Sequence, residues 1–164
     1  MAHQPVIDGL EFARAGASLQ GAWPIREFAR LREALASQDG DLAYELRGGK
    51  DRNDRLALRL KVRGSLQLVC QRCLGAMEYP VRVDSELVLA SSQEQIDAEP
   101  LEIGGPDWVL AGREMALREL IEDELLLAVP QAPRHAKCAA RETAAAGASR
   151  SPFESLRGLM RGKS

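Results

Sequence analysis

The sequence predicts an α+β protein with an antiparallel β-sheet built on one long hairpin, and two observations carry this prediction. Apolar side chains alternate with polar ones through residues 56–70 and again through residues 79–89, as in strands with one buried and one solvent-facing side. Apolar residues three and four positions apart occur before and after this region, and that spacing is typical of helices. The alternating residues are Leu56, Leu58, Leu60, Val62, Leu66, Leu68 and Cys70, followed by Tyr79, Val81, Val83, Leu87 and Leu89.

An N-terminal helix is predicted ahead of the hairpin, over residues 24–36. The proline at its start suits the first turn of a helix, where its missing N–H would have no partner. Phe28, Leu31 and Leu35 then follow at helical spacing. Residues 5–22 show no clear period, and we expect short strands or irregular structure there.

A further strand is expected between that helix and the hairpin. Leu42, Tyr44 and Leu46 alternate with polar residues, and the Gly-Gly-Lys-Asp sequence at 48–51 is a loop that permits a tight connection. After the hairpin, residues 108–110 could add another short strand.

An acidic amphipathic helix is predicted from about residue 112 to residue 128, stopped by Pro130. Its apolar residues are Leu117, Leu120, Ile121 and Leu125. Its polar side carries Glu119, Glu122, Asp123 and Glu124. Such a run of acids is usually a solvated face or a contact for a basic partner, and we expect a partner-binding surface here.

The chain is expected to form a single α+β domain over residues 1–138, which is long enough to bury a core of its own. Residues 139–151 are rich in Ala, Gly and Ser, as flexible linkers are. Residues 152–160 are expected to form a short helix with basic side chains on one side. The segment 139–164 is therefore predicted to be a linker followed by a short basic C-terminal helix.

The sequence also bears on the cellular compartment. No apolar run approaches the roughly 20 residues that a membrane helix needs, and the N-terminus lacks a basic region followed by an apolar stretch. Three cysteines, an odd number, argue against a disulfide framework. We expect a cytoplasmic protein without a membrane segment.

Charge is strongly segregated along the chain. Residues 47–82 carry nine basic and three acidic side chains, whereas residues 83–124 carry two basic and twelve acidic ones. Four cations are expected to alternate along the wet side of the first hairpin strand, in a row suited to an RNA backbone. They are Arg55, Arg59, Lys61 and Arg63. The equally strong alternative is that the acidic segment of the same molecule neutralises them.

Cys70 and Cys73 stand at the expected tip of the hairpin as Cys-Gln-Arg-Cys. A thioredoxin-type redox pair needs a helix N-terminus at the first cysteine, and here a strand ends there, so redox chemistry is disfavoured. His135 and Cys138 lie far downstream and would complete a four-ligand set for structural zinc. The competing interpretation is a half-buried thiol at a strand end with a solvated histidine.

Motifs for catalysis are lacking. The sequence contains no phosphate-cradling Gly-rich loop, no nucleophile elbow and no His-Glu-x-x-His helix. We therefore expect no enzyme activity and no small-molecule substrate.

Four sequence segments together resemble the YceD family, also called large ribosomal RNA subunit accumulation proteins. The segments are Cys70-Gln71-Arg72-Cys73-Leu74, the helix end Ile121–Pro130, the run Pro133-Arg134-His135 with Cys138 after it, and Pro152-Phe153 before a basic end. The resemblance implies a role in synthesis, processing or stability of the 23S ribosomal RNA in bacteria, with a plastid counterpart in plants. It implies no catalytic residues.

Two functional hypotheses follow. The first is a non-enzymatic ribosome biogenesis factor whose hairpin cations meet ribosomal RNA or pre-large-subunit particles, and whose acidic helix meets a basic ribosomal protein. The second is a protein–protein adaptor without RNA contact, in which Cys70 and Cys73 are a structural zinc or packing element.

Overall fold

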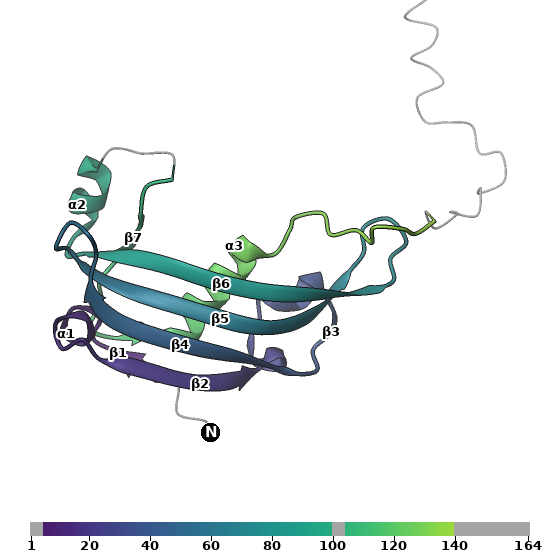
Figure 1. Ribbon diagram of the computed structural model, residues 1–164, viewed down its shortest axis with the longest axis horizontal. Helices are drawn as coiled ribbons and strands as arrows, with labels where there is room; N and C mark the ends of the chain where they lie inside the picture. Colours follow the sequence, from purple (N-terminus) through teal and green to yellow (C-terminus); the bar gives the residue numbers. More distant parts are fainter. Residues whose placement is uncertain (1–4, 100–103, 140–164) are drawn as a thin grey trace, which may run out of the picture.

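The computed structural model describes residues 5–99 and 104–139, and its central feature is a curved six-stranded β-sheet (Figure 1). The strands run in the order β2-β4-β5-β6-β7, and β3 pairs with β5 at residues 67 and 68, which β4 does not reach. The strands are β2 (Ser18–Pro24), β3 (Leu35–Ser37), β4 (Asp41–Lys50), β5 (Leu56–Val69), β6 (Ala76–Ala90) and β7 (Asp107–Leu110).

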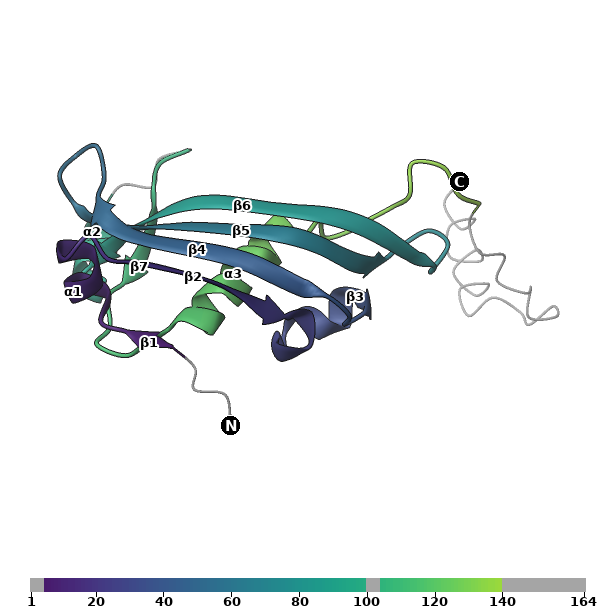
Figure 2. The same ribbon diagram turned by 60° about the horizontal axis from the view of Figure 1, so that its bottom comes forward.

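Short elements surround this sheet. The longest helix among the described residues, α3 (Leu117–Ala128), crosses one face of the sheet, as Figure 2 shows. A separate two-stranded ribbon joins β1 (Val6–Ile7) to β8 (Met115–Ala116). The remaining elements are the helices α1 (Gly9–Arg14) and α2 (Gln93–Ala98) and the 3₁₀ turns η1 (Ile25–Glu27) and η2 (Leu31–Ala34).

The long hairpin predicted from the alternating residues is confirmed. β5 and β6 pair in antiparallel register from Ala57 opposite Val88 to Val69 opposite Ala76. The even-numbered apolar residues of β5 from 58 to 68 have almost no exposed surface, and the charged residues between them face the other side. We call the side that α3 covers the inner face and the charged side the outer face.

Helix α3 closes the core on the inner face. Leu117, Ile121 and Leu125 are buried in the same cluster as the apolar side chains of β4, β5 and β6. Each such side chain contributes about 1.5–3 kcal/mol when it leaves water. The helix begins at Leu117, later than the predicted start near residue 112, because Met115 and Ala116 pair with β1 instead.

The predicted helix over residues 24–36 is wrong. Pro24 ends strand β2, and the turns η1 and η2 lead from there into β3, whose Leu35 pairs with Leu68. The apolar residues Phe28 and Leu31 are buried as expected. Their spacing of three suits a 3₁₀ turn as well as an α-helix, so the periodicity identified core residues without identifying the backbone.

Helix α1 lies where only strands or irregular structure were expected. Asp8 caps its N-terminus, since the Asp8 carboxylate accepts the N–H of Glu11 at 3.0 Å. An Asp at the N-cap followed by a Glu three residues later is a sequence signal for the start of a helix, and it could have predicted α1. The helix packs closely on Gly48 of β4, where an added Cβ would meet the backbone of Phe12 and Ala13.

The sheet is not purely antiparallel. β7 was expected as a short strand at 108–110, and it pairs in parallel with the end of β6, Val88 lying opposite Trp108. A parallel neighbour needs a crossover connection, and the segment that contains α2 provides it (Figure 1). At this end of the sheet, Ala57 and Val88 are buried although they lie at outer-face positions of the hairpin.

The remaining expectations concern a membrane-spanning helix, the C-terminal segment and the number of domains. None of the helices in the described residues is long and apolar enough to span a bilayer. The linker and the short C-terminal helix predicted for residues 139–164 lie, from residue 140 onward, outside the described residues. The single domain predicted for residues 1–138 stays a prediction.

Candidate metal centre and charged faces

The turn between β5 and β6 and the segment after α3 meet at one end of the sheet (Figures 1 and 2). Backbone hydrogen bonds shape this meeting, because Gln71 donates its N–H to the carbonyl of Pro133 at 2.8 Å. Within the turn, Leu74 donates to Cys70 and Cys70 donates to Gly75, both at 2.9 Å. Leu74 takes a positive φ of 59°, which the tight turn requires.

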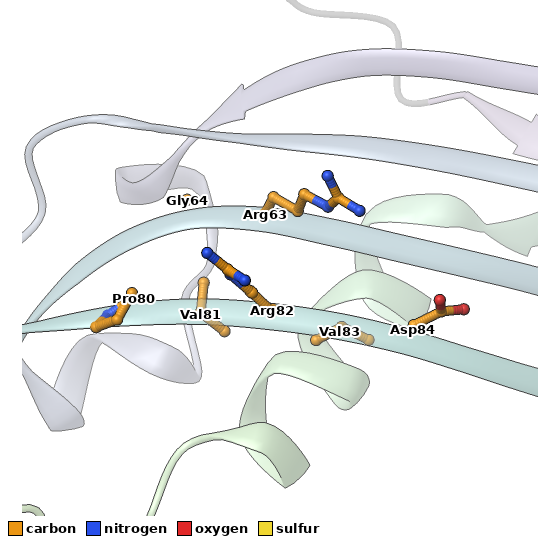
Figure 3. A pocket seen from close by; sticks show the side chains of 7 residues that line it. All are labelled: Arg63, Gly64, Pro80, Val81, Arg82, Val83 and Asp84. Carbon is orange, nitrogen blue, oxygen red and sulfur yellow. The ribbon is translucent and has the colours of Figure 1, made fainter.

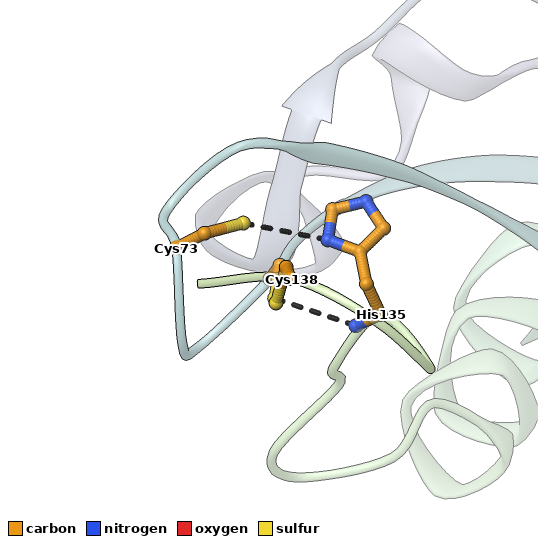
Figure 4. A group of neighbouring side chains, drawn as sticks. Cys73, His135 and Cys138 are labelled. Carbon is orange, nitrogen blue, oxygen red and sulfur yellow. Dashed lines mark hydrogen bonds between the residues drawn. The ribbon is translucent and has the colours of Figure 1, made fainter. Parts of the chain in front are cut away.

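This arrangement gathers Cys70, Cys73, His135 and Cys138, which we call the Cys3His cluster. One ligand atom from each residue lies within 4.8 Å of all the others, so the cluster could hold a metal ion such as zinc. Figure 4 shows Cys73, His135 and Cys138 turned toward one another. The four sequence-predicted metal ligands therefore lie together, although more than 60 residues separate the two halves.

Two of the distances between ligand atoms match the edges of a tetrahedral zinc site. Bond lengths of about 2.3 Å to sulfur and about 2.0 Å to nitrogen imply tetrahedron edges of about 3.8 Å between two sulfurs and about 3.5 Å between sulfur and nitrogen. The Cys70 and Cys138 sulfurs are 3.8 Å apart, and the Cys73 sulfur is 3.4 Å from His135 Nδ1. All three cysteines are free thiols in the structure.

The imidazole of His135 is held in the tautomer that a metal needs. Its Nε2 lies 3.1 Å from the carbonyl oxygen of Ala76. A carbonyl can only accept, so Nε2 carries a proton, and in the neutral ring the lone pair of Nδ1 is directed toward Cys73. A second partner of this kind is the usual way in which proteins orient a metal-binding histidine.

Backbone N–H groups also prepare Cys70 to be a thiolate. The Cys70 sulfur is buried and accepts N–H groups from Arg72 at 3.5 Å and His135 at 3.4 Å. A hydrogen bond from the N–H of Cys73 lowers the pKa of Cys70 the most, and burial raises it. The N–H groups of His135 and Arg72 lower it further, so the pKa of Cys70 falls to about 5. Burial and hydrogen bonding to Cys70 raise the pKa of Cys138, and a bound cation would hold this thiol deprotonated as well.

Three of the four predicted RNA-binding cations lie beside acidic partners. Arg55 pairs with the buried carboxylate of Asp51 and its guanidinium stacks 4.9 Å from the centre of the Trp108 ring. Arg59 and Lys61 both face Asp84 across the hairpin, at 3.1 Å and 3.9 Å. Arg63 is exposed, and no ion pair of Arg63 is found within the described residues.

The four predicted partner-binding acids of α3 divide into two pairs. Glu119 and Asp123 are exposed, whereas Glu122 and Glu124 are buried. Glu124 accepts the hydroxyl of Ser85 on β6, so it acts inside the fold.

Glu122 is engaged even more fully, by a residue that the sequence did not single out. Its carboxylate accepts the backbone N–H of Arg30 at 2.6 Å and of Leu31 at 3.2 Å, and the Nε of Arg30 at 3.1 Å. Arg30 also reaches Asp123 at 2.6 Å. Hydrogen bonding to Asp123, and then to Glu122, raises the pKa of Arg30 above its ordinary value. The contact joins α3 to the turn η2.

The fold and the cluster define a small α+β protein whose long hairpin ends beside a Cys3His cluster that could hold a metal ion. The family model for the large ribosomal RNA subunit accumulation protein YceD matches residues 58–157, more than half of the chain, and the protein belongs to this family. The match begins in β5 and includes all four residues of the cluster and the whole of α3. A comparison with solved structures found no significant match.

Proposed function

We propose that the protein is a non-enzymatic ribosome biogenesis factor that supports synthesis, processing or stability of 23S ribosomal RNA in the cytoplasm. The observation that carries the proposal is the family match over residues 58–157, because this family is named for accumulation of the large ribosomal RNA subunit. The cluster of candidate metal ligands and the charged surfaces described above are suited to a protein that acts by binding other molecules.

The Cys3His cluster would hold a structural zinc ion in this proposal. Four protein ligands fill the tetrahedral coordination of zinc and leave no position for a substrate. The ion would tie the turn of the hairpin to the segment after α3, adding a metal cross-link to the hydrogen bonds that already join these two parts of the chain. Support comes from the ligand spacing and from the tautomer of His135.

Two surfaces would meet partners. Cations on the outer face of the hairpin would contact ribosomal RNA, with Arg63 the most available of the predicted group. The exposed acids Glu119 and Asp123 of α3 would contact a basic ribosomal protein, and Glu122 and Glu124 would support α3 from inside.

A second function, a protein–protein adaptor without RNA contact, draws on one specific observation. Arg59 and Lys61 are paired with Asp84 of the same hairpin, and paired cations attract a phosphate backbone less strongly. The adaptor would use the acidic side of α3 and leave the outer face to solvent.

Co-sedimentation tests the first function. Extracts of the native host are separated on a low-salt gradient, and we expect the protein with pre-large-subunit particles and a reduced level of 23S ribosomal RNA when its gene is deleted. Absence from every ribosomal fraction, together with normal 23S ribosomal RNA after deletion, would contradict the proposal. Crosslinking in cells separates the alternatives, because an adaptor should yield protein crosslinks and no RNA.

A further inference from the structure

Two arginines stand directly opposite each other on the outer face of the hairpin. Arg63 on β5 and Arg82 on β6 are register partners, and both side chains are exposed. Figure 3 shows both extending from neighbouring strands, while Val83 lies lower on the ribbon. Like charges directly opposite each other in a sheet are destabilising, so a sequence that keeps them there points to a ligand of opposite charge.

Two acids close to this pair along the strands are already engaged. Asp84, two residues along β6, faces Arg59 and Lys61, and Glu45 on β4 pairs with Arg47. Over residues 5–99 and 104–139, no carboxylate forms an ion pair with Arg63 or Arg82. The internal neutralisation that covers the rest of the outer face therefore stops at this row of the sheet.

The surface around the two arginines leaves room for a ligand. Arg63 and Arg82 border a hollow of about 540 Å³, which Pro80 and Asp84 also line. On the other side of Arg63, its register partner on β4 is Ala43, whose own partner on β2 is Ala22. Both alanines are exposed and short, so neither shields the guanidinium of Arg63.

We propose that Arg63 and Arg82 form a phosphate-binding pair for the backbone of ribosomal RNA. A guanidinium binds phosphate oxygens through two parallel N–H donors, and two guanidiniums on adjacent strands can hold one phosphate or two successive ones. The bound phosphate would relieve the repulsion between the arginines. This inference rests on the proposed function. It assigns the RNA contact to one pair of opposite residues in the sheet instead of to all four cations predicted along β5. Arg82 belongs to the pair although the sequence analysis did not name it as an RNA-binding residue.

Such a pair recognises RNA by its backbone charge. Phosphate contacts position a protein on a nucleic acid and carry no sequence information of their own. Binding through the pair should therefore depend steeply on salt and weakly on sequence.

The test measures binding of the full-length protein to a 23S ribosomal RNA transcript at several salt concentrations. The variant Arg63→Gln/Arg82→Gln keeps polar side chains that can hydrogen-bond but loses both charges, and Arg59→Gln is the matched control because Arg59 is paired with Asp84. We expect the double variant to bind roughly tenfold or more weakly, with a salt slope smaller by about 1 for each arginine. Arg59→Gln should change the affinity and the salt slope far less. Arg63→Lys/Arg82→Lys should keep much of the salt slope. The thermal midpoint of the double variant should not fall, since a repulsive pair has been removed.

The outcomes separate the inference from the function. If the wild-type protein binds the transcript and the double variant binds equally well with the same slope, the phosphate-binding pair is wrong and the proposed function stands. If the double variant loses protein crosslinks from pre-large-subunit particles while its RNA crosslinks persist, the pair binds an acidic protein and the inference is again wrong. If the wild-type protein binds neither the transcript nor the particles, the proposed function fails first and the inference fails with it.

Discussion

His135 donates its Nε2–H to the backbone carbonyl of Ala76 at 3.1 Å, and this single contact decides which ring nitrogen faces the cysteines. Ala76 begins β6, and His135 lies on the segment that follows α3. The hairpin therefore orients a ligand that arrives from a distant part of the chain. The relationship makes the cluster a candidate for preorganised zinc binding, and it leads directly to measurements.

Zinc content is the first prediction. Protein purified without chelator should contain about one equivalent of zinc, because four ligand atoms lie within 4.8 Å of one another and zinc favours four such N and S ligands. Elemental analysis measures this, and Cys73→Ser and His135→Ala should each lower the content sharply. Gln71→Ala changes a side chain in the same turn that is not a ligand and serves as the control. Wild-type protein with zinc far below one equivalent would refute the metal site.

Zinc removal should release the segment after α3 from the hairpin. Arg134 and Lys137 are exposed sites for trypsin on this segment, and the segment is held to the hairpin by the Gln71–Pro133 hydrogen bond and by the cluster. A chelator should speed tryptic cleavage after both residues, because a protease needs a locally opened backbone. Cleavage after Arg52, in the loop between β4 and β5, should keep its rate. Equal cleavage at Arg134 with and without metal would count against a structural role for zinc.

Glu122 is expected to be the most sensitive acid of α3. Glu122→Ala removes the acceptor of the N–H groups of Arg30 and Leu31, and unpaired buried donors are costly. We expect a loss of about 2–4 kcal/mol in the free energy of unfolding, measured by urea denaturation. Asp123→Ala is the matched control, because Asp123 is exposed and also pairs with Arg30, and it should cost less than about 1 kcal/mol. Equal losses for the two variants would contradict the internal role of Glu122.

Two adjacent glycines provide a test of how α1 packs on the sheet. A Cβ at Gly48 would lie 2.8 Å from Ala13 Cα and closer still to the carbonyl of Phe12, whereas a Cβ at Gly49 would meet no atom within 4 Å. Gly48→Ala should destabilise the protein by about 1–3 kcal/mol, and Gly49→Ala should stay within about 0.5 kcal/mol of the wild type. Thermal unfolding of the two variants measures the difference, and similar midpoints would show that α1 does not pack as described.

Asp51 should contribute a pH-dependent part of the stability. Burial raises the pKa of Asp51, but hydrogen bonds from the Arg55 side chain and from the N–H groups of Arg55 and Asn53 outweigh it, so the pKa lies below its ordinary value. A lowered folded-state pKa stabilises the protein above the unfolded value of about 3.9, and this contribution is lost as the pH falls through the folded pKa.

Asp51→Asn should therefore lower the free energy of unfolding at neutral pH, and its difference from the wild type should shrink as the solution is acidified below about pH 4. Urea denaturation over a pH series measures this, with Asp41→Asn on the exposed side of β4 as the control. A constant difference at every pH would mean that the Asp51 charge contributes nothing.

Some errors of the sequence prediction have an identifiable physical cause. The apolar residues Phe28, Leu31 and Leu35 suited a helix, but the backbone N–H groups of Arg30 and Leu31 found a stronger acceptor in Glu122 than a helix carbonyl offers. The same contact explains the error about α3, whose acids were all predicted to bind a partner, because Glu122 is turned inward to accept these N–H groups. A sequence pattern shows which side chains are charged, and it does not show that a carboxylate 92 residues away is aimed at a backbone turn.

The sequence by itself determined the hairpin, the core residues of α3, the four members of the Cys3His cluster and the family. These depend on side-chain period and on residue type, which local chain geometry translates directly into faces and turns. Only the tertiary structure decided that β7 runs parallel, that Glu122 and Glu124 turn inward, and that Arg63 and Arg82 face each other with no ion pair to either among the described residues. Each of these depends on the register and packing of distant segments, where the free energy of pairing is shared between residues that no local pattern connects.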